Sequence, residues 1–288
     1  MGAGDPRALD FRAAAGVDLA KLCDALNDAY ADYPTPFRLT ASQLELLLQS
    51  RGFDPELSGV AIAGGDVAAA WLTGVRRPAT EAAYVIAVGV RRTFLRRGLA
   101  RALFAFVASR LRACGLRTLG LEVIEKNAAA RDLYESLGFE PVRRLACLSA
   151  EKMAVHKANG WRTRSVPVAV LETLARQEGD WRPTWQNDVE SLRNISEQLD
   201  LQGVFHDGAC IGAGALIGPT RTVAQIIVAR PYRRRGVGAA IMADWVRRHG
   251  RQSANAINID AAASVTLAFM AAHGFAEKVR QLDMVFRL

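Results

Sequence analysis

The chain has 288 residues, of which half are apolar and 23% are charged, and its formal net charge is +8. This composition excludes an intrinsically disordered chain, and the length predicts two domains that each bury a core. The four cysteines lie far apart and include no Cys-x-x-Cys pair, so we expect neither a disulfide framework nor a metal site.

The sequence contains no segment typical of membrane insertion or export. The most apolar stretch, Val67–Val75, is far shorter than the roughly 18 residues of a spanning helix. The first ten residues carry two acids and no apolar run, unlike a signal peptide. We therefore expect a cytoplasmic protein that does not bind membranes.

Arginine dominates the positive charge, because only five of the 37 basic residues are lysines and 32 are arginines. One interpretation is a phosphate-bearing partner, since arginine forks bind phosphate well, and the other is a set of solvated surface charges. Aromatic residues make up only 7% of the chain and do not interleave with the basic ones. Nucleic acid is therefore not the expected partner.

Helices and strands are predicted to alternate along the whole chain. In the first half we expect helices at 19–30, 41–50 and 127–137, and strands at 59–63, 68–74, 84–90 and 118–124. A further helix should follow the Arg-rich turn after the third strand and run to about residue 114. In the second half we expect helices at 166–177, 183–196, 236–249 and 264–273, strands at 201–206, 209–217, 223–229 and 256–260, and a final strand. Asn127 is a predicted N-cap, and Gly115 and Gly138 are predicted to end helices.

The two halves repeat one pattern, a buried strand followed by an Arg-rich turn and a helix. Gly98 and Gly236 mark this turn and are 138 residues apart, while Gly138 and Gly274 of the two downstream Gly-Phe pairs are 136 apart. Two landmarks at nearly the same offset indicate a duplicated domain. We predict α/β (α+β) domains at residues 1–155 and 156–288, each with a mixed, mostly antiparallel sheet flanked by helices.

The Arg-rich turn is suited to binding a diphosphate. Free N–H groups and the positive end of the helix dipole meet at the start of the helix, and small residues let a phosphate approach the backbone. The turn has no Gly-Lys-Ser/Thr and no Gly-x-Gly-x-x-Gly after a first strand, so neither a P-loop nor a dinucleotide fold is expected. A tight connection carrying solvated arginines is the alternative.

The sequence resembles the GCN5-related N-acetyltransferase (GNAT) superfamily, whose acetyl-CoA signature is Gln/Arg-x-x-Gly-x-Gly/Ala. The second repeat matches this signature at Arg233, Gly236 and Gly238, whereas the first has Leu95 in the leading place. The first repeat also contains the family's Leu121–Glu122–Val123 segment, followed by Asn127, Ala130, Leu133–Tyr134 and Leu137–Gly138–Phe139. The resemblance covers both halves and implies an acyl-CoA-dependent N-acetyltransferase of tandem architecture, acting on a small-molecule or peptide amine without a metal.

The resemblance also implies roles for residues of the first repeat. Backbone groups of Val88, Gly89 and Val90 would pair with the pantetheine arm. Asn127 would reach the pantetheine arm or its thiol end, and Ala130 is a further cofactor-binding candidate. The diphosphate would be wrapped by the turn made of Leu95, Arg96, Arg97, Gly98, Leu99, Ala100 and Arg101. In the second repeat, Arg233, Arg235, Gly236 and Gly238 are the corresponding candidates.

Tyr134 and Glu122 are the candidate catalytic residues. A phenol beside the thioester sulfur can protonate the leaving thiolate, and a carboxylate can take the proton of the attacking amine. The alternatives are a tyrosine that packs its ring on the sheet and a surface carboxylate. Asp28, Tyr30, Asp32 and Tyr33 belong to a segment that lines the acceptor side in the family, and they could also be ordinary loop residues.

The second repeat departs from the family at the catalytic end. Met270 replaces Tyr134, Ala263 replaces Asn127, and methionine has no proton to donate. We expect His273 to be a surface residue at a helix end. The second domain is therefore predicted to be degenerate in catalysis, whether or not it binds CoA. A non-enzymatic CoA-binding protein is the second hypothesis, and either a monomer or a homodimer fits the duplication.

Overall fold

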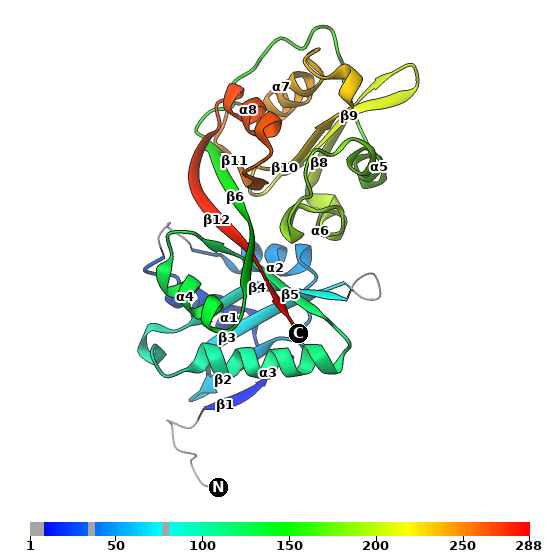
Figure 1. Cartoon of the computed structure of the whole chain (residues 1–288). Coiled ribbons are helices and arrows are strands. Elements are labelled where there is room, and N and C mark those ends of the chain that lie inside the picture. Colours follow the sequence, from blue (N-terminus) through cyan, green and yellow to red (C-terminus); the bar gives the residue numbers. More distant parts are fainter. Residues whose placement is uncertain (1–8, 34–37, 77–80) are drawn as a thin grey trace. The chain divides into compact units, whose positions relative to one another are not determined.

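The structure, a computed structural model, describes residues 9–33, 38–76 and 81–288. It divides into two compact units, which we call the N-terminal and C-terminal units (Figure 1). The N-terminal unit runs up to Val142 and also includes Asp283–Leu288, whereas the C-terminal unit is Arg143–Leu282. The boundary between the units differs from the one expected after residue 155. Two long strands, β6 (Glu140–Ala150) and β12 (Ala276–Arg287), each contribute residues to both units.

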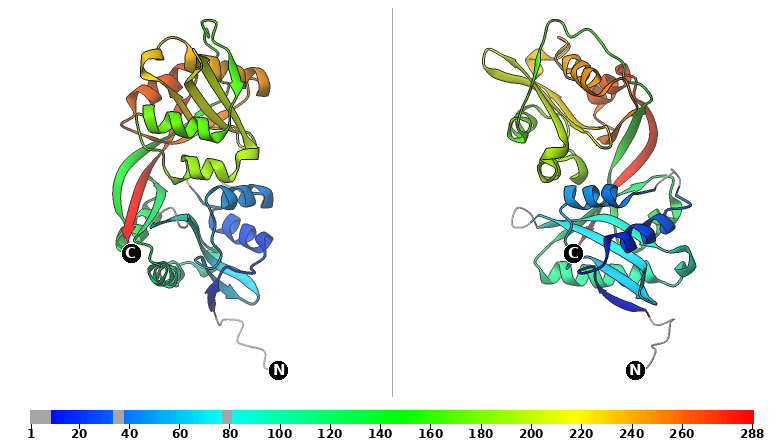
Figure 2. Two further views of the ribbon diagram at one scale, coloured as in Figure 1. Left: turned by 90° about the vertical axis from the view of Figure 1, so that its right-hand side faces the viewer. Right: turned by 180° about the vertical axis from the view of Figure 1, so that it is seen from behind.

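The N-terminal unit is a mixed sheet with helices on both faces. Its strands follow the order β1-β2-β3-β4-β5 and then the end of β12. The strands are β1 (Asp10–Ala13), β2 (Gly59–Ala63), β3 (Asp66–Val75), β4 (Ala82–Val90) and β5 (Thr118–Ile124). The helices are α1 (Leu19–Ala29), α2 (Ala41–Ser50), the short η1 (Arg92–Phe94), α3 (Leu99–Ala113) and α4 (Ala128–Ser136). Figure 2 shows α1 and α2 on one side of these strands and α3 on the other.

Local chemistry sets the ends of these helices. The side chain of Asp18 accepts hydrogen bonds from two N–H groups of α1, and Thr40 forms a capping box with Gln43 at α2. Asn127 caps α4 by accepting from the N–H of Ala130 at 3.2 Å, as predicted. Gly115 and Gly138 have φ angles of +76° and +94°, which confirms their predicted role as left-handed residues after α3 and α4.

The last residues of the chain complete the core of the N-terminal unit. Phe286 on β12 packs against Phe104 at a ring-centroid distance of 5.0 Å and against Phe139 at 5.4 Å. Gly138 lies beneath the same ring, because a Cβ at this position would be 3.2 Å from Phe286. This contribution and the short strand β1 are not among the features expected from the sequence.

The C-terminal unit repeats this architecture. Its strands follow the order β12-β6-β11-β10-β9-β8-β7. The strands not yet given are β7 (Thr163–Ser165), β8 (Leu199–His206), β9 (Ala209–Ile217), β10 (Thr222–Val228) and β11 (Ala254–Asp260). The longer helices are α5 (Val168–Glu178), α6 (Val189–Asn194), α7 (Val237–His249) and α8 (Ser264–Ala272). Figure 1 shows α7 and α8 on one side of these strands and α5 and α6 on the other.

The predicted single helix at residues 183–196 is wrong. The segment forms the turns η2 (Trp185–Asn187) and η3 (Ser196–Gln198) on either side of α6. Asp188 has an extended backbone and its side chain accepts from the N–H of Ser191, so it starts a new helix. A side chain that caps in this way competes with continuation of the preceding turn. The turn η4 (Arg230–Tyr232) completes the unit.

Both units contain one pair of parallel strands that separates after a few residues. In the N-terminal unit, β4 pairs with β5 over Ala82–Tyr84. In the C-terminal unit, β10 pairs with β11 at Thr222 and Asn255. The pairing of β4 with β3 contains a register shift just beyond the residues that pair with β5. The pairing of β10 with β9 contains a shift at the equivalent place, as expected for bulges that bend the strands apart. Each unit therefore has a gap between two strands, and the Arg-rich turn follows at the end of that gap.

Candidate functional site

The edge of β4 that faces this gap presents backbone hydrogen-bonding groups. The N–H of Arg91 donates to Ala68 on β3 at 2.9 Å, and N–H and C=O groups alternate between the two edges of a strand. The N–H and C=O groups of Val88 and Val90 therefore point away from β3. Gly89 has a different role, because a Cβ there would lie 3.0 Å from both Leu26 and Ala29 of α1. Val88 and Val90 are thus the better placed of the three predicted residues to pair with an extended ligand.

The turn before α3 forms an open cradle of backbone N–H groups. Arg96 and Gly98 both have left-handed backbone, with φ of +61° and +75°. No side chain among the described residues caps α3, and a Cβ at Gly98 would have nothing within 4 Å. Consecutive N–H groups in such a turn form a concavity that suits an anion, and the helix dipole adds to it. The residues present therefore fit a diphosphate.

The arginines of this turn lie at the surface around the cradle. Arg96 and Arg97 are exposed, and Arg97 lies over the ring of Phe94 at 5.0 Å. Arg101 donates to the hydroxyl of Ser136 on α4 at 2.6 Å. Leu95 is 53% exposed. Charge at this end therefore comes from arginines that follow Leu95.

Three tyrosines gather at the other end of the gap. Tyr30, at the end of α1, donates from its hydroxyl to the carbonyl of Val88 at 2.9 Å, and its ring lies 5.2 Å from that of Tyr33. Tyr134 on α4 packs edge-on against Trp71 at 6.2 Å. Burial raises the pKa of Tyr134 far above its ordinary value, and the neighbouring Tyr30 and Tyr33 raise it further. The hydroxyl of Tyr134 therefore stays protonated at neutral pH and can act as a donor.

Asn127 connects α4 to this tyrosine cluster. Besides capping the helix, its side chain hydrogen-bonds the hydroxyl of Tyr33. Burial nevertheless raises the pKa of Tyr33 above its ordinary value. The structure thus places Asn127, Tyr30, Tyr33 and Tyr134 together beside Val88. The sequence identified each of them, but no pattern in it indicated that Tyr30 and Tyr33 would contact Val88 and Asn127.

Glu122 lies on β5 and has a partner across the gap. The hydroxyl of Tyr84 on β4 donates to its carboxylate. Glu122 is half-buried, and Tyr84 is 4% exposed. Asp28 is engaged differently, because it accepts from the backbone N–H of Arg92 at 2.8 Å and pairs with the Arg92 guanidinium. Asp28 therefore holds the start of η1, and the rest of the predicted acceptor-side segment, residues 34–37, lies outside the described residues.

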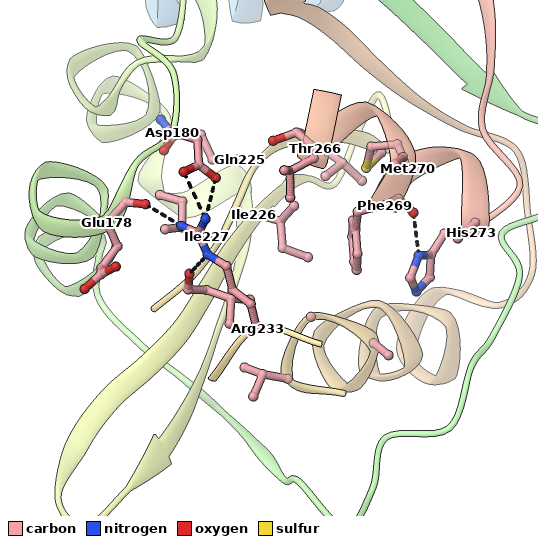
Figure 3. Close-up of a pocket in the computed structure, with 18 of the residues that line it drawn as sticks. Glu178, Asp180, Gln225, Ile226, Ile227, Arg233, Thr266, Phe269, Met270 and His273 are labelled. Carbon is pink, nitrogen blue, oxygen red and sulfur yellow. Dashed lines mark hydrogen bonds and ion pairs between the residues drawn. The ribbon is translucent and has the colours of Figure 1, made fainter. Parts of the chain in front are cut away.

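In the C-terminal unit the signature residues contact the protein itself. Arg233 donates to the carbonyls of Val228 and Glu178, each at 2.9 Å, and pairs with Asp180 at 2.9 Å (Figure 3). A Cβ at Gly238 would lie 2.9 Å from the ring of Phe269. The turn keeps the same backbone as in the first repeat, with φ of +61° at Arg234 and +86° at Gly236.

Residues Lys157–Trp161, which we call the strap, cover this second turn. Asn159 and Trp161 both donate from their side chains to the carbonyl of Arg235, at 3.2 and 2.8 Å. A Cβ at Gly236 would lie 3.0 Å from Nδ2 of Asn159 and 3.2 Å from the carbonyl oxygen of Lys157. The repeat that matches the acetyl-CoA signature better in sequence therefore has the less accessible turn.

The expectation that His273 lies at the surface is wrong. The residue is 3% exposed, because its ring packs 4.2 Å from Phe269 and 4.8 Å from His156. Its Nδ1 lies 2.8 Å from the carbonyl oxygen of Phe269, which requires that Nδ1 carries the proton. Burial lowers the pKa of His273 and keeps it neutral.

Within residues 9–33, 38–76 and 81–288, no cluster of three or more His, Cys, Asp or Glu side chains could hold a metal ion. Over the same residues no helix is long and apolar enough to cross a membrane.

Comparison with known proteins identifies the domain family. Residues 22–139 match the model of the acetyltransferase (GNAT) family. This segment of the chain is a GNAT-family domain. A mycothiol acetyltransferase from Beutenbergia cavernae is 38% identical over 117 residues, which is 40% of this chain and only 38% of that protein's length. The similarity thus spans little more than a third of the length of the mycothiol acetyltransferase.

Two solved structures match this chain over nearly its full length. A tandem GNAT protein from the clavulanic acid biosynthesis pathway has a TM-score of 0.72 at 17% identity, with 97% of this chain and 98% of that chain covered. A GCN5-related N-acetyltransferase from Sphaerobacter thermophilus has a TM-score of 0.71 at 18% identity, with 97% and 95% covered. At these identities the likeness concerns the fold, and it confirms the predicted tandem GNAT architecture.

Proposed function

We propose that the protein transfers an acetyl group from acetyl-CoA to a primary amine, and that the reaction takes place in the N-terminal unit. One observation supports this proposal: three features lie along the same gap between β4 and β5. These are the open turn at Gly98, the backbone edge of β4 at Val88 and Val90, and the tyrosine cluster around Tyr134. The GNAT family uses acetyl-CoA, and the likeness to a mycothiol acetyltransferase supports acetyl as the transferred group.

The residues of the chain would bind acetyl-CoA along this gap. The backbone from Arg96 to Arg101 would hold the diphosphate, with arginine side chains adding charge-assisted hydrogen bonds. Val88 and Val90 would pair with the amides of the pantetheine arm. When bound, acetyl-CoA supplies a thioester whose carbonyl carbon an amine can attack.

Side chains of the protein then transfer two protons. Tyr134 donates a hydrogen bond and a proton to the leaving sulfur, and its raised pKa keeps it in the donating form. Glu122 accepts the proton that the amine loses, directly or through water. Tyr84 orients the Glu122 carboxylate through its hydroxyl. Tyr30 and Asn127 act as positioning residues, because they hold Val88 and Tyr33.

A thiol-release assay with acetyl-CoA and a panel of primary amines tests this proposal. We expect amine-dependent release of CoA, at a rate that falls strongly in Tyr134→Phe. Binding of acetyl-CoA without thiol release for any amine would instead support a CoA-binding protein without transferase activity. No binding at all would contradict both functions.

A further inference from the structure

The C-terminal unit contains a pocket of about 560 Å³ between β10, α8 and the start of α7 (Figure 3). Ile226 lies on the strand side of this pocket, and Phe269 and Met270 line the helix side. The pocket occupies the gap between β10 and β11 and therefore corresponds to the acetyl-CoA gap proposed for the N-terminal unit. Its walls are mostly apolar.

The strand in this pocket presents an edge of backbone groups. Ala229 donates from its N–H to Ile211 on β9 at 2.9 Å, so Ile226 and Val228 direct their N–H and C=O groups away from β9. The carbonyl of Val228 accepts from Arg233, and Ile226 lies further into the gap. An extended chain with amide groups could pair with this edge, as peptides do with an exposed strand.

Two side chains in the pocket wall have unsatisfied acceptor atoms. Gln225 donates from Nε2 to the carbonyl of Asn187, and its Oε1 has no partner in the described part of the chain. His273 donates from Nδ1 to Phe269, and its Nε2 likewise has no partner there. Both residues are at least nine-tenths buried. Buried acceptors of this kind require a donor from water or from a ligand.

The strap makes this pocket unsuitable for a diphosphate. Its Asn159 and Lys157 lie against Gly236, where a phosphate would have to approach the backbone. The charge of Arg233 is already balanced by Asp180. In the N-terminal unit, by contrast, the space beside Gly98 is open.

We propose that the C-terminal pocket binds a neutral, amide-bearing ligand that lacks a diphosphate, and that the strap excludes CoA from it. The ligand lies along the edge of β10 and donates N–H or O–H groups to acceptors in the wall. The proposal concerns a different site from Tyr134 and does not depend on acetyl transfer there.

Methionine-methyl NMR on the full chain tests the proposal, because Met270 lines the pocket and Met284 belongs to the other unit. Pantetheine serves as the probe, since it has two amides and no phosphate, and CoA is the same arm with a diphosphate. We expect a saturable shift of the Met270 signal with pantetheine and none with CoA at equal concentration. The variant Met270→Leu assigns the signal.

A second variant isolates the strap. Asn159→Ala combined with Trp161→Phe removes both donors to Arg235, while a ring remains at position 161 to pack on Tyr232. We expect CoA to shift the Met270 signal in this variant, with the fold verified by circular dichroism. Any of three results would overturn the proposal. CoA shifts the Met270 signal in the unmodified chain, pantetheine does not shift it, or CoA does not shift it in the strap variant.

Discussion

Gly98 and Gly236 begin equivalent helices with the same left-handed backbone, yet only Gly236 is covered by other residues of its own unit. The turn at Gly98 is open to an anion, and the turn at Gly236 is filled by the strap. From this difference we propose that acetyl-CoA binds in the repeat whose signature is incomplete in sequence. The proposal implies that one copy of the duplicated domain has kept a transferase site and that the second copy has changed its use.

Replacing Tyr134 by phenylalanine tests the proposed acid. The ring packing against Trp71 survives, so only the hydroxyl is lost. We expect kcat to fall by roughly 10²–10⁴-fold with little change in acetyl-CoA affinity. Met270→Leu, at the corresponding position of the second repeat, is the matched control and should leave kcat unchanged. An unaltered kcat in Tyr134→Phe would remove the acid role.

The raised pKa of Tyr134 also leads to a prediction for the alkaline side of the pH profile of kcat. Tyr134 must be protonated to donate, and its pKa is raised above the ordinary value of about 10. Raising the pH to about 10 therefore should not deprotonate it, and kcat should show no Tyr134-dependent fall in that range. The measurement compares kcat profiles of the unmodified chain and Tyr134→Phe. An alkaline fall near pH 8 that disappears in the variant would contradict the prediction.

Replacing Glu122 by glutamine tests the proposed base. Glutamine keeps the size and can still accept from Tyr84, but it cannot take a proton from the amine. We expect kcat/KM for the amine to fall by roughly 10²-fold or more, while acetyl-CoA binding is retained. Tyr84→Phe, which removes only the hydrogen bond to Glu122, should cause a smaller loss. Equal activity of Glu122→Gln and the unmodified chain would mean that Glu122 is structural.

The contribution of β12 to the N-terminal unit predicts a stability effect. Phe286 packs against Phe104 and Phe139, and we expect Phe286→Ala to lower the free energy of unfolding by about 2 kcal/mol. Because the ring is half-buried, this is less than the loss for a fully buried phenylalanine. Arg287→Ala, at an exposed neighbouring position, is the control. Denaturant unfolding followed by near-UV circular dichroism measures both variants, and equal stability would contradict the packing described here.

Much of the fold could be predicted from local chemistry. Asn127 caps α4 because its side chain accepts from an N–H of the first turn, and Gly138 ends α4 because glycine adopts the left-handed backbone without strain. The long-range relationships could not be predicted in this way. The strap contacts Arg235 from 76 residues away, and Phe286 reaches a core built mainly from the first half of the chain. Such contacts depend on how elements pack after they have formed.

The same distinction applies to the candidate site. The residue types of Arg233, Gly236 and Gly238 match a phosphate-binding pattern, but each satisfies a packing requirement in its own unit. Leu95 departs from the pattern, yet its side chain is exposed and the turn stays open at Gly98. A motif specifies which backbone conformation is allowed, and the neighbouring residues decide whether a ligand can use it.

We propose that acetyl-CoA binds to the turn at Gly98 and not to the turn at Gly236. This assignment is tested by calorimetric titration of the full chain with acetyl-CoA, beside the variants Gly98→Glu and Gly98→Asn. Glutamate places a carboxylate where the diphosphate would lie, whereas asparagine tolerates the left-handed backbone without adding charge. We predict one site per chain, lost in Gly98→Glu and retained, with weaker affinity, in Gly98→Asn. Two sites per chain, or one site that Gly98→Glu leaves intact, would mean that acetyl-CoA binds outside the turn at Gly98.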